Sequence, residues 1–144
     1  MGKSFKGAKD KRERGSFLAI PTAVLDSKNY ASLSYSSVKL LLDVSRQYRG
    51  HNTGDLCAAW KVMKPKGWRS EATLNKAKKE LLDKGFLFET RKGRRPNLCG
   101  LYAVTWLALD PSSKYDIAPK GYTYGAWKLN EPLPPIQPRL AAVA

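Results

Sequence analysis

Apolar residues recur at helical spacing in a first segment, residues 34–50. Ser34 is a suitable N-cap, Leu33 and Val38 stand where a hydrophobic staple would, and Gly50 stands where a helix stop belongs. The members of the stripe are Val38, Leu41, Leu42, Ser45 and Tyr48, widened by Leu40 and Val44. This pattern predicts a buried helix that begins after Ser34 and ends near Gly50.

A second helical pattern begins at Ser70, another suitable N-cap, and stops at Gly85. Glu71 lies in the first turn, where the helix dipole favours an anion. The apolar face holds Leu74, Ala77, Leu81 and Leu82. The opposite face holds Ala72, Lys76, Lys79 and Asp83, flanked by Thr73, Asn75 and Glu80. The helix therefore has an apolar face toward the core and, on the other side, a face that carries cations and an amide.

From Phe86 the apolar period changes to two, which is typical of strands. Residues 86–91 and 101–106 both alternate in this way, so they predict a β-hairpin. The segment between them, RKGRRPNLCG, combines turn-forming residues with four basic side chains. We therefore expect a hairpin with a cationic tip.

The segments around these elements carry weaker patterns. Residues 17–33 read as an extended lead-in with Pro21 and a turn near Ser27, and Asp55–Ala58 reads as one short strand. Residues 59–67 predict a helix of about two turns that ends at Pro65 and Gly67.

A chain of 144 residues supports one compact core with tails. We expect a basic, disordered tail over 1–15 and a folded domain over 16–110. Tyr115, Tyr122, Tyr124 and Trp127 indicate that the extension 111–130 packs on the domain or on a partner subunit. The Pro-rich residues 131–144 predict a flexible tail.

Charge changes this picture from a generic domain to one with a polyanionic partner. Lys and Arg number 26 against 12 Asp and Glu, for a net charge of +14. The excess is concentrated in residues 1–15, with 6 basic and 2 acidic side chains, and in residues 61–95, with 12 and 4. Such clustering favours nucleic-acid binding over general solvation.

Parts for other functions are missing from the sequence. The single histidine, His51, has no metal or triad pattern around it, no phosphate-binding glycine loop occurs, and Cys57 and Cys99 form no C-x-x-C pair. We therefore expect no catalysis, no metal and no cofactor, and two cysteines that serve as small buried apolar residues. Without an apolar run of membrane length or a signal-peptide pattern, we expect a cytoplasmic protein with no membrane partner.

The order of predicted elements resembles the winged helix-turn-helix family of DNA-binding domains. The resemblance covers residues 17–109 and rests on LSYSSVKLLLDVSRQY as first helix, GWRSEATLNKAKKELLDKGFL as turn and recognition helix, and ETRKGRRPNLCGLYAVTW as wing. Within the family it is most similar to small proteins of bacterial plasmids, phages and integrated elements and to winged domains of replication initiators. It implies an α+β fold of three helices with a β-hairpin wing, plus the C-terminal extension, and a double-stranded DNA partner bound by a possible homodimer.

The DNA-contacting residues follow from chemistry and from this resemblance. The recognition helix would offer side chains that hydrogen-bond bases or phosphates, namely Arg69, Ser70, Thr73, Asn75, Lys76 and Lys79. The wing would offer Arg91, Lys92, Arg94 and Arg95. Weaker contacts would come from the tail residues Lys9, Lys11, Arg12 and Arg14.

Four roles remain open for this basic surface. The first is sequence-specific DNA binding by a transcriptional regulator of a bacterial mobile element or its host. The second is a replication or partition accessory protein that binds origin DNA. The others are a protein-interaction module with an acidic partner and an RNA-binding module.

Overall fold

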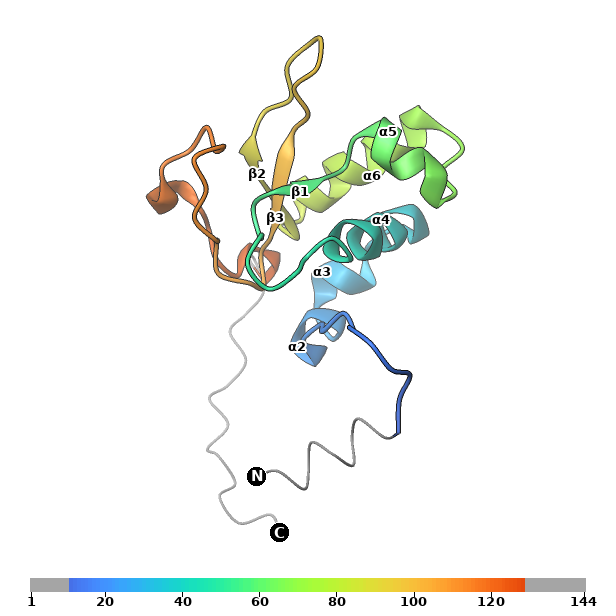
Figure 1. Cartoon of the computed structure of the whole chain (residues 1–144). Coiled ribbons are helices and arrows are strands. Elements are labelled where there is room, and N and C mark those ends of the chain that lie inside the picture. The colour runs from blue at the N-terminus through green and yellow to red at the C-terminus, as the bar shows by residue number, and fades with distance from the viewer. Residues whose placement is uncertain (1–10, 129–144) are drawn as a thin grey trace.

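The computed structural model describes residues 11–128, which form an α+β fold (Figure 1). Five α-helices accompany a three-stranded antiparallel sheet in this part of the chain. The helices are α2 (Thr22–Leu25), α3 (Lys28–Ala31), α4 (Tyr35–Ser45), α5 (Trp60–Met63) and α6 (Glu71–Asp83). The strands are β1 (Leu56–Cys57), β2 (Leu87–Arg91) and β3 (Leu101–Val104). Short 3-10 turns are η1 (Lys64–Lys66), η2 (Pro119–Gly121) and η3 (Ala126–Lys128).

The two long helices begin at the predicted serine caps. The Ser34 hydroxyl accepts the Ser37 N–H at 3.2 Å, and the Ser70 hydroxyl accepts the Thr73 N–H at 3.3 Å. Each cap satisfies a backbone donor that the first helical turn leaves without an internal partner. The sequence therefore locates the start of both helices.

The C-terminal end of α4 differs from the prediction, since the helix ends at Ser45 and not near Gly50. The reason is the side chain of Gln47, which acts as a strand partner for β1. Its amide donates to the Cys57 carbonyl at 2.7 Å and accepts the Cys57 N–H at 2.8 Å. A longer helix would carry this amide away from the strand edge.

The buried face of α4 is also rotated from the predicted stripe. Ser37, Leu40, Leu41 and Val44 are at most 2% exposed, whereas Leu42 is 43% exposed. The face is fixed by packing against α6, where the Ser37 hydroxyl lies 3.4 Å from the Ala77 carbonyl oxygen. Leu42 therefore falls outside the core.

In the sheet, β3 is the central strand, in the order β1-β3-β2. Residues 101–106 are all buried, so the predicted in-and-out alternation of this strand is wrong. The sheet has cover on a second side because the chain after β3 folds back on it: the ring of Tyr122 meets Phe88 edge-on, with centroids 5.3 Å apart. Central strands covered on both faces lose the polar half of the pattern.

The lead-in 17–33 is not extended as predicted, because it contains α2 and α3. The turn at Ser27 joins them: its hydroxyl donates to the Val24 carbonyl at 2.7 Å and accepts the Tyr30 N–H at 3.1 Å. Val24 is fully buried, so this segment contributes to the core.

The aromatic segment after β3 packs on the same chain. The Tyr122 hydroxyl donates toward the carbonyl oxygens of Val104 and Leu107, at 3.0 and 2.7 Å. The Tyr115 hydroxyl donates toward those of Thr53 and Asp110, at 3.0 and 2.6 Å. Tyr124, by contrast, is 63% exposed. The part of the predicted extension beyond residue 128 and the Pro-rich tail lie outside the described residues.

None of the helices within residues 11–128 is both long enough and apolar enough to cross a membrane.

Candidate nucleic-acid interface

The entry to α6 separates buried from exposed side chains over a few residues. η1 ends at Lys66 and is capped by Gly67, and Trp68 then turns into the core, where its indole N–H donates to the Asp43 carboxylate at 2.9 Å. Arg69 follows it and is exposed. Anchoring Trp68 thus places a guanidinium directly ahead of the N-terminus of α6.

All predicted recognition-helix residues are exposed: Arg69, Ser70, Thr73, Asn75, Lys76 and Lys79. Two of them are already engaged. Ser70 caps the helix, and the Lys79 ammonium pairs with the Asp83 carboxylate at 2.7 Å. The side chains of Arg69, Asn75 and Lys76 have no hydrogen-bond or ion-pair partner within residues 11–128.

Glu80 does not belong to this exposed face, although the sequence pattern put it on its flank. Its carboxylate accepts the backbone N–H of Ser34 at 2.7 Å, which ties α6 to the start of α4. This hydrogen bond is the main cause that lowers the pKa of Glu80. On α6, Asp83 is thus paired with Lys79 and Glu80 is bound to the Ser34 N–H, whereas the exposed Glu71 has no ion-pair partner among the described residues.

The wing is the segment between β2 and β3. Its tip is held by reciprocal backbone hydrogen bonds between Arg94 and Leu98, at 2.7 and 2.9 Å. Lys92, Arg94 and Arg95 are exposed there. The side chains of these three residues form no ion pair among the described residues.

Arg91, also predicted as a wing contact, lies across the wing stem. Its guanidinium donates to the Cys99 carbonyl at 2.9 and 3.2 Å and lies 3.7 Å from the Cys99 sulfur. Both cysteines are half-buried, not fully buried as expected. Burial raises the pKa of the Cys57 thiol, whose sulfur accepts the Ala59 N–H at 3.5 Å.

The C-terminal segment also supports the stem. Lys92 donates its N–H to the Asp116 carboxylate at 3.0 Å, and Asp116 donates its N–H to the Thr90 carbonyl at 2.8 Å. The base of the wing is therefore pinned, while its tip projects away. Figure 1 shows the wing tip and the beginning of α6 together in the upper half of the view.

The predicted tail contacts are partly described. Lys9 lies outside the described residues, while Lys11, Arg12 and Arg14 are exposed. The Arg12 guanidinium stacks 4.2 Å above the ring of Phe17.

Sequence reasoning missed further exposed groups beside the start of α6. Lys61, Lys64 and Lys66 are exposed on α5 and η1, and their only signal was the charge of the block 61–95. Tyr35, at the start of α4, is 95% exposed and borders a groove of about 360 Å³ that also includes Arg69 and Thr73. The only indication in the sequence that Tyr35 is exposed is that it lies outside the apolar stripe predicted for residues 34–50.

Comparison of this chain with protein-family models, curated proteins and solved structures finds no match. The described residues contain no group of three or more potential metal ligands.

Proposed function

We propose that this protein binds double-stranded DNA through the exposed face of α6 and the tip of the wing. The observation that carries the proposal is the distribution of unpaired cations. Arg69 just ahead of α6, Lys76 on α6, and Arg94 and Arg95 on the wing are exposed and have no ion-pair partner within residues 11–128. Unpaired cations on the exposed face of a helix and on a projecting hairpin match the phosphates of a duplex.

The shapes of these elements suit the two grooves. An α-helix enters the major groove with its first turns against base edges, and α6 presents Asn75 and Lys76 there. A narrow cationic hairpin can enter the minor groove or follow the backbone. The order α4, β1, α5, α6, β2, β3 with sheet order β1-β3-β2 is compatible with a winged helix and supports this assignment.

Sequence-specific binding is favoured over purely electrostatic binding. Asn pairs bidentately with adenine and Arg with guanine, and Asn75 and Arg69 both keep these groups free. We accordingly propose a regulator of transcription in a bacterial mobile element or its host, a role that rests on the resemblance drawn from the sequence.

The proposal is tested by fluorescence anisotropy with a labelled duplex of mixed sequence. Arg94→Ala/Arg95→Ala should bind about tenfold more weakly or worse, because two charge-assisted contacts are lost. The control Lys28→Ala/Lys120→Ala removes the same charge from exposed residues on α3 and η2, and should bind within about twofold of the unmodified protein.

Equal losses in both double variants would show attraction by net charge alone. Preference for a structured RNA over the duplex in direct competition would reassign the surface to RNA. Absence of duplex binding, with retention of an acidic protein, would reassign it to protein recognition.

A further inference from the structure

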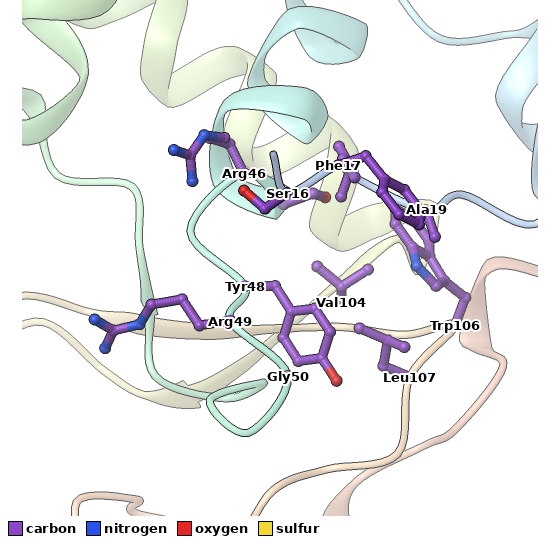
Figure 2. Close-up of a pocket in the computed structure, with 12 residues that line it drawn as sticks. Ser16, Phe17, Ala19, Arg46, Tyr48, Arg49, Gly50, Val104, Trp106 and Leu107 are labelled. Carbon is purple, nitrogen blue, oxygen red and sulfur yellow. The ribbon is translucent and has the colours of Figure 1, made fainter. Parts of the chain in front are cut away.

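A cavity of about 420 Å³ lies at the C-terminal end of α4 (Figure 2). Its walls come from three segments: residues 16–19 of the lead-in, residues 45–50, and residues 104–107 at the end of β3. None of these residues belongs to α6 or to the wing. The cavity is thus separate from the proposed DNA interface.

One side of the cavity is apolar. Val104 is fully buried and Trp106 is 6% exposed, and the side chains of Phe17, Tyr48 and Leu107 complete the wall. Figure 2 shows Tyr48, Val104, Trp106 and Leu107 gathered on this side. The volume lies within the range of pockets that hold small organic molecules.

The rim of the cavity is cationic. Arg46 and Arg49 are exposed, and Figure 2 shows both side chains extending on the side away from Trp106. Neither guanidinium has an ion-pair partner within residues 11–128, and no carboxylate lines the cavity. An anion is the ligand charge that such a rim favours.

We propose that this cavity binds a small monocarboxylic acid with an aromatic or branched apolar body. The body would pack against Phe17, Tyr48 and Leu107, and the carboxylate would meet Arg46 and Arg49 at the rim. A polyphosphate or a sugar fits less well, because the wall offers apolar carbon where these ligands need hydrogen-bond partners.

The probe for the test is 1-naphthoate, with the neutral 1-naphthamide as its matched control. Both are titrated into the full-length, ¹⁵N-labelled protein and followed by amide chemical shifts. We expect naphthoate to bind with a Kd below about 1 mM, shifting the amides of residues 45–50 and 104–107, and naphthamide to bind at least about tenfold more weakly.

Two double variants test the role of the rim arginines. Arg46→Gln/Arg49→Gln should remove the preference for the acid over the amide, whereas Lys28→Gln/Lys120→Gln, with the same change in net charge, should keep it.

Three results would overturn the proposal. The first is that the amide chemical shifts of the lining residues stay unchanged when naphthoate is added well above about 1 mM. The second is equal affinity for naphthoate and naphthamide. The third is unchanged binding of the acid by the double arginine variant.

Discussion

Glu80 is a single residue whose ionisation couples two helices. Its carboxylate accepts the N–H of Ser34 just ahead of α4, and this bond holds the pKa of Glu80 below its ordinary value of 4.5. A carboxyl whose pKa is lowered on folding stabilises the fold above its unfolded pKa, and that contribution disappears as the pH falls through the folded pKa. The stabilisation is therefore present at neutral pH and lost in acid.

Glu80→Ala should lower the free energy of unfolding at pH 7 by about 1 kcal/mol or less, since the pair is near the surface and screened by solvent. Urea unfolding from pH 7 to about pH 3 measures this, and the difference from the unmodified protein should shrink below about pH 4.5. Asp26→Ala is the control, because this exposed carboxylate has no partner among the described residues. A difference that stays constant over the whole pH range would contradict the role of the charge.

We expect Asn75 and Lys76 to contact bases and determine sequence specificity, and Arg94 to contact the phosphate backbone. Asn75→Ala or Lys76→Ala should cost about 1–3 kcal/mol on the preferred site and reduce discrimination between sites. Arg94→Ala should weaken all duplexes to a similar degree. Site selection with the purified protein, followed by titration of selected and scrambled duplexes, measures both. If all three variants lose equally on both duplexes, the reading face lies elsewhere.

At the scale of elements, the connection between α6 and the hairpin requires glycine at position 85. Its φ is +81°, and a Cβ there would collide with the carbonyl group of Ala126 in η3. Gly67 provides a matched comparison, because its φ is +97° but a Cβ there would meet nothing within 4 Å.

Gly67→Ala should therefore lower the free energy of unfolding by about 1–2 kcal/mol, which is the cost of holding alanine at a positive φ. Gly85→Ala should lower it clearly more, because its Cβ would also collide with Ala126. Thermal and urea unfolding of the two variants gives the difference. Equal costs would mean that η3 is not held against Gly85 in solution.

The sequence predicts those elements whose signals are local. Ser34 and Ser70 mark helix starts, Gly67 and Gly85 mark stops, and the period of two marks the hairpin. It does not predict α2 and α3, because each has only four residues. The end of α4 is set by a distant partner, since Gln47 pairs with Cys57, and no pattern around Gln47 encodes that contact.

The candidate interface is predictable in the same limited sense. Exposure of the cationic residues follows from the apolar face of α6 and from the turn residues of the wing. The sequence does not predict which of these cations lack a partner. The pairing of Lys79 with Asp83 and of Arg91 with Cys99 depends on side-chain conformation. The cavity beside Ser45 joins three segments far apart in the sequence and gives no sequence signal.

At the scale of the whole molecule, the charge of +14 sets how binding should depend on salt. If α6 and the wing together neutralise roughly six phosphates, log affinity should fall with log salt at a slope near −5, from about −0.9 per phosphate. Anisotropy titrations between about 50 and 200 mM salt measure the slope. A slope shallower than about −2 would contradict a large phosphate interface.

The central position of β3 has a consequence for how the molecule opens. Residues of β3 are at most 4% exposed and pair with strands on both sides, one of them β1, far back in the sequence. Their amide hydrogens should exchange with solvent deuterium only when the entire domain unfolds, while the amides of the wing tip exchange through local fluctuations. The hairpin thus joins the slowest-exchanging part of the domain to its proposed DNA contact, so the tip can adapt to a groove without loosening the core.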